Sequence, residues 1–201
     1  MSPRRANPEL AERRREALIK AGYAEILEKG IPSTTIDSVV ERAGTSKGGA
    51  LYYFRTKDDL LYAVFHWLLS QLDRTLAEVT QAARSPRARL AAELELLFHS
   101  AEVNRKLYKV LFEFVALSLH SERFRTLLNS FFAKWRERDM EIIADGIHQE
   151  QFRHVRPEDV AITLRALVDG YCLQWIMSEP ESNLDEYRDR CRAVLGSYLL
   201  R

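Results

Sequence analysis

Residues 34–61 read TTIDSVVERAGTSKGGALYYFRTKDDLL, and this stretch decides how the whole chain is organised. Thr34 or Thr35 is placed to cap a short helix that ends at Gly44. A glycine at that position supplies the positive φ that a tight turn requires. A second short helix follows over 47–53. Two short helices joined by a glycine-containing turn form a helix-turn-helix, which the sequence therefore predicts here.

The second short helix carries side chains that suit DNA better than a protein core. Glycines at the start of a helix let the backbone approach a phosphate closely, and the free N–H groups there favour an anion. A tyrosine hydroxyl reaches phosphate oxygens while its ring packs on sugars or on a thymine methyl. The alternative is that all these aromatic residues fill the core of a three-helix unit, and we assign only Leu51 and Phe54 to that core. We predict DNA contacts from Ser46, Lys47, Gly48, Gly49, Tyr52 and Tyr53.

The predicted recognition helix lacks the side chains that read bases through paired hydrogen bonds. No Arg, Asn or Gln occurs between Thr45 and Phe54, so we expect DNA shape and backbone contacts to contribute much of the specificity. The net charge of +1 does not by itself indicate nucleic acid. Arg4, Arg5 and 13–15 form a basic run near the start of the chain, which is either a phosphate-binding arm or a solvated tail.

Outside this stretch, apolar residues recur at spacings of three and four, the period of amphipathic helices. We expect Gly30 to end the first helix in the left-handed conformation, and Pro180 to lie beyond the end of the penultimate one. The sequence therefore predicts an all-α protein of about nine helices, with a helix-turn-helix domain at 1–60 and a larger helical domain at 61–201. The predicted helices are 10–29, 36–43, 47–53, 57–79, 86–98, 104–118, 122–150, 157–179 and 183–198.

Composition excludes several classes of protein. Hydrophobic residues make up 46% and charged residues 29% of the chain, which is ordinary for a soluble globular protein. Two cysteines, no signal peptide and no uninterrupted apolar run of about 18 residues predict a cytoplasmic protein with no membrane contact. Catalytic groupings and phosphate-binding glycine loops are missing, so we predict no enzyme activity. The histidines and cysteines show no metal-type clustering, and we predict neither a metal nor a cofactor.

The stretch from Ala11 to Leu61 resembles, without gaps, the DNA-binding region of the TetR family of transcriptional regulators. That resemblance implies that the third helix enters the major groove of operator DNA. It also implies that the threonine at the start of the second helix and the lysine that opens the fourth bind phosphates. Thr35 and Lys57 therefore join the predicted DNA contacts. Tyr53 stands where many members of the family have histidine.

Residues 167–175, LVDGYCLQW, are similar to the penultimate helix of many TetR-type proteins. The last two helices of each subunit form a four-helix dimer interface in that family. Independently, residues 160–177 are apolar nearly all round, which the surface of a monomer would not tolerate. We therefore predict a homodimer through the last two helices, whose paired recognition helices read a pseudo-palindrome.

The resemblance also implies a pocket inside the larger domain, formed by helices four to eight, that receives a small-molecule effector. Ligand entry would then shift the fourth helix, spread the two DNA-reading heads and lower operator affinity. The alternative is a ligand-independent regulator whose larger domain only dimerises; repression is the majority behaviour of the family. Aromatic residues are the candidates for the pocket wall, although each also suits a core position. The candidates are Trp67, Phe98, Tyr108, Phe112, Phe131, Trp135 and Tyr171.

Three further residues have two interpretations each. Glu113, between two phenylalanines, is either a buried acid that faces a cation or part of a solvated face, and we favour the solvated face. Cys172 and Cys191 lie on the two predicted interface helices. They are either a redox switch or buried thiols that pack as small apolar groups, and we favour the second interpretation.

Overall fold

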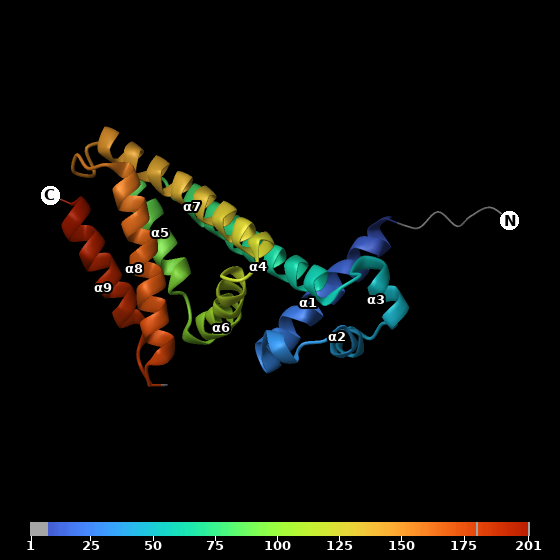
Figure 1. Cartoon of the computed structure of the whole chain (residues 1–201). Coiled ribbons are helices and arrows are strands. Elements are labelled where there is room, and N and C mark those ends of the chain that lie inside the picture. The colour runs from blue at the N-terminus through green and yellow to red at the C-terminus, as the bar shows by residue number, and fades with distance from the viewer. Residues whose placement is uncertain (1–7, 180, 201) are drawn as a thin grey trace.

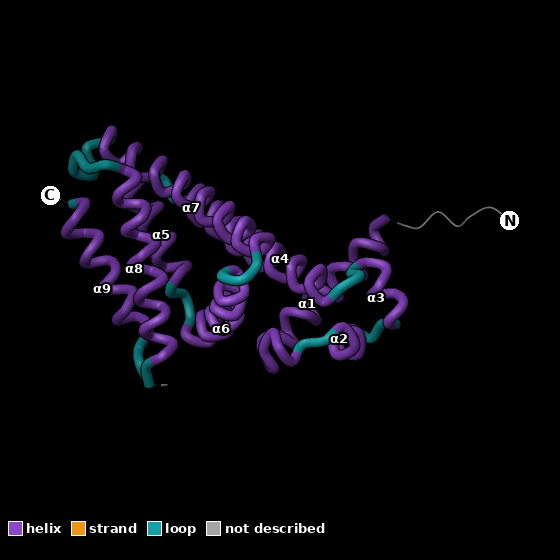
Figure 2. The backbone as a smooth tube through the Cα atoms, in the orientation of Figure 1, coloured by secondary structure: helices purple, strands orange, loops and turns teal. Residues whose placement is uncertain are grey.

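The computed structural model describes residues 8–179 and 181–200. Arg4, Arg5 and Pro180, which entered the predictions above, lie outside these residues. The described residues form helices joined by turns and contain no strand, so the all-α prediction is confirmed (Figure 2). Their nine helices are α1 (Pro8–Ser33), α2 (Ile36–Ala43), α3 (Lys47–Tyr53), α4 (Lys57–Ala82), α5 (Pro86–Leu97), α6 (Ala101–Ser118), α7 (Glu122–His148), α8 (Pro157–Met177) and α9 (Leu184–Leu199).

The molecule is elongated, with a small head at one end and a larger body at the other (Figure 1). Helices α1, α2 and α3 make the head. Helix α4 starts in the head and runs beside α7 into the body. Helices α8 and α9 lie side by side at the far end, and α6 lies between the body and α1. Because α4 is continuous, the head and the body share one rigid element.

The caps of the short helices explain where the head turns. Thr35, rather than Thr34, caps α2: its hydroxyl accepts the N–H of Ser38, and the Ser38 hydroxyl accepts the N–H of Thr35. Gly44 has φ 61° and ψ 36°, which confirms the predicted left-handed turn. The Ser46 hydroxyl caps α3 by accepting the N–H of Gly49.

The first helix ends differently from the prediction. Gly30 has positive φ, at 79°, but its ψ of 164° is extended instead of left-handed helical. The chain kinks at this glycine and continues as one more helical turn to Ser33. Thr34 is fully buried, and its hydroxyl donates to the carbonyl of Gly30 at 2.8 Å. The kink therefore leads directly into the cap of α2.

Close packing of α1 and α6 on α4 fixes the head against the body. Gly22 in α1 faces α4, where an added Cβ would lie 2.9 Å from Cγ2 of Val64. On α6, Phe114 stacks on Phe65 of α4, with ring centroids 4.5 Å apart and planes inclined by 9°. Both phenylalanines are fully buried. These contacts join the head, α4 and α6 into one packed unit.

Candidate DNA-binding surface and ligand cavity

Helix α3 presents most of the predicted DNA contacts to solvent. Ser46, Lys47 and Gly48 are exposed, and Tyr52 is 79% exposed. A large aromatic side chain with that exposure contributes little to the core and is available to a partner. Gly49 and Tyr53 are half-buried, and Thr35 at the start of α2 is exposed.

The assignment of Leu51 to the core is wrong. Leu51 is 39% exposed, whereas Phe54 is 4% exposed, as predicted. Helix α3 has only seven residues and buries a single one, Ala50, against the rest of the head. Successive residues of a helix are rotated by about 100°, so the neighbour of a buried alanine turns outward.

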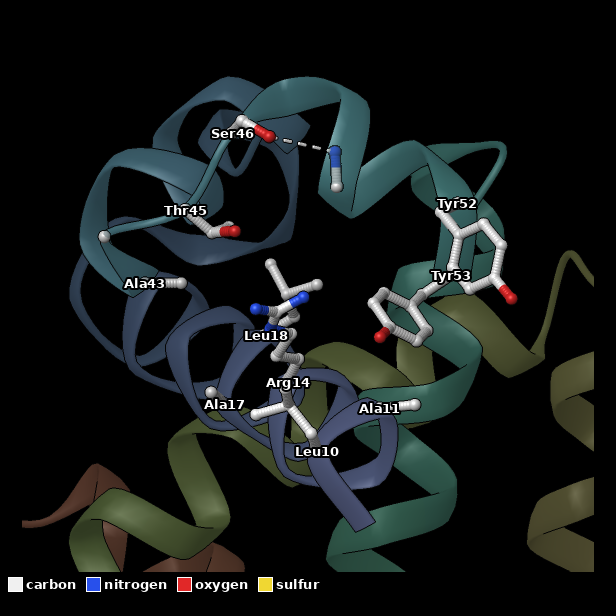
Figure 3. Close-up of a pocket in the computed structure, with 12 residues that line it drawn as sticks. Leu10, Ala11, Arg14, Ala17, Leu18, Ala43, Thr45, Ser46, Tyr52 and Tyr53 are labelled. Atoms are coloured by element: carbon white, nitrogen blue, oxygen red, sulfur yellow. Dashed lines mark hydrogen bonds between the residues drawn. The ribbon is translucent and has the colours of Figure 1, made fainter. Parts of the chain in front are cut away.

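Beside α3 lies a groove of about 610 Å³ between α1 and the helix-turn-helix (Figure 3). Arg14 rises from α1 into this groove, which is also lined by Ser46, Tyr52 and Tyr53. The Arg14 side chain is exposed, and no ion pair holds it among the described residues. The sequence signal for Arg14 was the basic run at 13–15, which did not separate this residue from its neighbours.

The two lysines of the predicted DNA-binding set already have partners within the head. The Lys47 ammonium lies 2.8 Å from Oδ1 of Asp37. The Lys57 ammonium donates to the carbonyl oxygens of Ile31, at 2.7 Å, and Pro32, at 3.1 Å. A DNA phosphate that contacts either lysine would displace these partners or share the ammonium group with them. Lys57 therefore has a structural role that its place in the sequence motif does not reveal.

A buried carboxylate that the motif also does not reveal joins α1 to α2. Glu25 is 2% exposed, and its oxygens accept hydrogen bonds from Arg42 at 2.5 Å and Lys29 at 3.1 Å. Burial alone would raise the pKa of Glu25, but hydrogen bonds from Arg42, Ser38 and Lys29 outweigh it and lower that pKa to about 2. The ionised carboxylate thus holds the helix-turn-helix on α1.

Inside the body, a cavity of about 170 Å³ lies among α4, α5, α6, α7 and α8. Four of the seven predicted wall residues line it: Tyr108, Phe112, Phe131 and Trp135. The other three lie elsewhere. Trp67 packs edge-on against Tyr23 of α1, Phe98 is fully buried at the end of α5, and Tyr171 packs against Tyr187 of α9. The remaining wall residues are Leu72, Leu97, Leu107, Leu111, Val115, Leu128, Phe132, Arg165 and Asp169.

One charged pair reaches this otherwise apolar and aromatic wall. The Arg165 guanidinium lies over the Trp135 ring, 3.8 Å from its centroid, and forms an ion pair with Asp169 one helical turn further along α8. Guanidinium groups are attracted to the negative face of an indole ring. Arg165 therefore already occupies the aromatic face that an incoming cation would use.

Two fully buried carboxyl groups lie behind Trp135. The Trp135 indole N–H donates to Oε1 of Glu93 at 2.5 Å, and the Asp139 carboxyl lies against that of Glu93. Burial, followed by the interaction with Glu93, raises the pKa of Asp139; burial likewise raises the pKa of Glu93. Two adjacent buried carboxyls cannot both ionise cheaply, so the pair holds a proton at neutral pH.

We expect Asp139→Asn to remove a pH dependence of stability. The unfolded carboxyl ionises near 3.8, whereas the folded one keeps its proton, so folding takes up a proton at neutral pH. The contribution of the Asp139 carboxyl to the free energy of unfolding is fully present below pH 3.8. It is lost as the pH rises toward the elevated pKa, by roughly 1.4 kcal/mol per pH unit. An asparagine has nearly the same shape as the aspartic acid but does not titrate.

Thermal unfolding between pH 6.5 and 8.5 measures this effect. The variant should gain several degrees relative to the wild type as the pH rises, at about 2–4 °C per kcal/mol. Asp145→Asn, which alters an exposed ion pair with Arg89, is the matched control and should follow the wild type. Parallel curves for Asp139→Asn and the wild type would show that the pair is ionised.

Glu113 is neither a fully buried acid nor part of a fully solvated face. Its side chain is half-buried, and Oε2 accepts the backbone N–H of Ile31 at 2.5 Å. Glu113 therefore faces a peptide N–H in the head and keeps part of its exposure to solvent. Sequence spacing carries no sign of this contact, because the two residues lie 82 positions apart.

Both cysteines are fully buried, and burial is the main cause that raises the pKa of Cys172 to about 11 and of Cys191 to about 12. Thiolates are the reactive form, so these thiols should be inert. We expect no alkylation by iodoacetamide in the folded protein at pH 8 and two alkylated sites in denaturant, counted by mass spectrometry. Rapid alkylation of the folded protein would instead favour the interpretation that the cysteines form a redox switch.

Five large apolar side chains on the outer face of α8 and α9 are exposed. They are Ile162, Leu173, Met177, Val194 and Tyr198, of which Met177 is 73% exposed. Among the described residues, α8 is the one helix long and apolar enough to cross a membrane by length and composition. Its inner face packs in the body core through fully buried residues such as Val168 and Trp175. A helix that is apolar on both sides in this way needs a second surface to cover its outer face.

Family models match both parts of the chain. Residues 18–64 match bacterial regulatory proteins of the tetR family, and residues 86–200 match the C-terminal domain of BetI-type transcriptional repressors. The HTH-type transcriptional regulator BetI of Burkholderia pseudomallei (strain K96243) is 31% identical over 166 residues, which cover 82% of this chain and 83% of that protein. BetI of Pectobacterium carotovorum (strain PC1) is 30% identical over 179 residues, covering 86% and 87%.

Solved structures share the fold. A TetR transcription regulator from Haloarcula marismortui superposes with a TM-score of 0.85 at 26% identity, over 94% of this chain and 99% of that one. A protein from Saccharomonospora viridis, solved in complex with choline, has the same TM-score and coverage at 22% identity, which shows the fold alone. With the exposed recognition helix and the matches over both parts, the chain belongs to the TetR family of bacterial regulatory proteins and is a DNA-binding transcriptional repressor, not an enzyme.

Proposed function

We propose that this repressor acts in the cytoplasm as a homodimer that binds a pseudo-palindromic operator and is released by a small-molecule effector. Residues 1–60 bind DNA, and residues 61–201 dimerise and sense the effector. The observation that carries the DNA-binding part is helix α3, whose capped start and 79% exposed Tyr52 face solvent beside Arg14. We add Arg14 to the predicted contacts, because its guanidinium supplies the bidentate donor that α3 lacks.

Selection of duplex DNA from a random library tests operator recognition. The wild type should enrich a two-fold palindrome whose half-sites are about one helical turn apart. Binding should weaken steeply between about 50 and 200 mM salt, because phosphate contacts release counterions. Arg14→Ala should relax the base preference or lower affinity, whereas an unchanged motif and affinity would remove Arg14 from the contact set.

The dimer is supported by the apolar outer face of α8 and α9. A charge placed in the centre of such a face should prevent association because it would be buried without a partner. We expect Leu173→Glu to sediment as a folded monomer that has lost most of its operator affinity. Leu119→Glu, at an exposed leucine directly after α6, is the matched control and should remain dimeric. A dimeric Leu173→Glu would place the interface elsewhere.

For the effector, we propose a small organic cation of the choline type that enters the cavity. The choline complex of the S. viridis protein suggests the class, and the aromatic wall of the cavity supports it. The faces of aromatic rings attract a quaternary ammonium group. Because Arg165 covers Trp135, the effector must displace this guanidinium or use the remaining rings.

Two probe molecules of similar shape test whether the effector must carry a positive charge. Choline should lower operator affinity about tenfold or more, and 3,3-dimethylbutan-1-ol, its uncharged analogue of similar shape, should not. Trp135→Leu should abolish the response, and Trp67→Leu, which alters a tryptophan outside the cavity, should retain it. Equal release by both probes would indicate an uncharged effector. Release by neither probe would favour a regulator whose body only dimerises.

A further inference from the structure

The turn at residues 30–33 is held from two sides. On one side, Glu113 of α6 accepts the N–H of Ile31 at 2.5 Å. On the other, the Lys57 ammonium at the start of α4 donates to the carbonyls of Ile31 and Pro32. The turn lies between the long part of α1 and the cap of α2, so its position sets where the helix-turn-helix begins.

A residue without a Cβ is needed at position 30, next to this contact. Its φ of 79° disfavours any residue with a Cβ, and an added Cβ would lie 3.0 Å from Oε1 and 3.3 Å from Oε2 of Glu113. Backbone and carboxylate therefore approach each other as closely as a glycine allows. A charge-assisted hydrogen bond of this kind is stronger than one between neutral groups.

On the α6 side of this contact, the neighbours of Glu113 line the cavity. Phe112, the residue before Glu113, lines the cavity, and Leu111 and Val115 of the same helix line it too. Phe114, the residue after Glu113, is the one that stacks on Phe65 of α4. A molecule that fills the cavity pushes on the segment of α6 that carries Glu113, because close-packed helices move as units instead of compressing.

Beyond the turn, a series of hydrogen bonds continues to the recognition unit. The Gly30 carbonyl accepts both the N–H and the hydroxyl of Thr34, which is fully buried. Thr35 follows directly and caps α2 through Ser38. A displacement of the turn therefore displaces the start of α2 and, through the Gly44 turn, helix α3.

We propose that Glu113 is the positioning residue that transmits occupancy of the cavity to the DNA-binding head, through its hydrogen bond to Ile31. The proposal rests on the effector response of the proposed function, and it adds a direct route from α6 to α1 beside the movement of α4. Glu113 lines neither the groove beside α3 nor the cavity in the body. Its role is to make operator affinity depend on the position of α6.

A cavity-filling substitution tests this route without knowledge of the effector. Leu128→Trp adds an indole to the cavity from α7. Combined with Glu113→Ala, Glu113→Gln or the control Glu102→Ala, it forms a set of double-mutant cycles. Glu102 lies on the same helix and forms an exposed ion pair with Lys106, one turn away. Thermal unfolding of each variant checks that it is folded. If Glu113→Ala is too unstable, Glu113→Gln replaces it in the comparison, because glutamine keeps the side-chain shape and a carbonyl acceptor but not the charge.

The readouts are operator affinity and hydrogen exchange of the Ile31 amide without DNA. Leu128→Trp should weaken operator binding about tenfold and speed the exchange of Ile31. In the Glu113→Ala background the loss of operator binding should shrink to less than about threefold, and with Glu102→Ala it should stay tenfold. An equal loss in all backgrounds, or no loss in folded Leu128→Trp protein, would overturn the proposal. If no variant binds DNA, the proposed function fails, and the response of Ile31 exchange to Leu128→Trp still decides whether the route exists.

Discussion

Replacing Tyr52 by alanine should lower operator affinity by a factor of about 100 or more and leave the fold intact. Tyr52 is 79% exposed, and its ring packs edge-on against that of Tyr53, with centroids 5.0 Å apart, so the substitution removes almost no core packing. A good DNA contact contributes about 1–3 kcal/mol. In a dimer the loss occurs at both half-sites, and the two losses multiply.

Affinity for the selected operator, measured by fluorescence anisotropy at fixed salt, checks this prediction. Tyr52→Phe distinguishes the two functions of the side chain, because it retains the ring and removes the hydroxyl. Leu119→Ala is the control for an exposed apolar side chain in the body, and it should bind like the wild type. If Tyr52→Ala also binds like the wild type, α3 does not present this residue to DNA.

The second large effect concerns Glu25. Glu25→Ala should destabilise the head by about 1.5–3 kcal/mol, because it removes the buried carboxylate that accepts charge-assisted hydrogen bonds from Arg42 and Lys29. Arg42 keeps its second ion pair, with Glu28. The expected consequence is an early-melting head and weak operator binding, although no DNA contact has changed. Glu16→Ala, which breaks an exposed ion pair with Lys20, should cost less than about 1 kcal/mol.

Acid should reproduce part of this loss in the wild type. The pKa of Glu25 is about 2 in the folded protein against 4.5 for an unperturbed carboxyl. Its stabilisation is therefore fully present above pH 4.5 and is lost as the pH falls toward 2. Denaturant unfolding at pH 7 and pH 3.5 measures the effect, and the difference between Glu25→Ala and wild type should be smaller at pH 3.5. A constant difference would mean that the carboxylate does not hold the head through its charge.

The elements of the head could be predicted because their determinants are local. Thr35, Gly44 and Ser46 act on backbone groups within four residues of themselves, so their spacing in the sequence predicts the helix ends. Amphipathic spacing likewise predicts the body helices, because one helical turn brings residues three and four apart to the same face. Leu51 was misplaced because a seven-residue helix is too short for its spacing to show which face is buried.

The candidate cavity was predicted only in part. An aromatic residue at helical spacing faces inward, but sequence does not tell whether it meets another side chain or an open space. Tyr108, Phe112, Phe131 and Trp135 border the cavity, whereas Phe98 fills the core. What separates these positions is the relative placement of α5, α6, α7 and α8, which depends on all of their side chains together.

By itself, the sequence determined the all-α class, the helix-turn-helix and its exposed recognition surface, since each depends on contacts within a few residues. Tertiary structure alone decided which polar groups act together: Glu25 with Arg42, Glu93 with Asp139, and Glu113 with the backbone N–H of Ile31. These partners are separated by 17 positions in the first pair and by 82 in the last. Such pairs form only when packed helices bring polar groups out of water together, where each must find a partner or lose its charge.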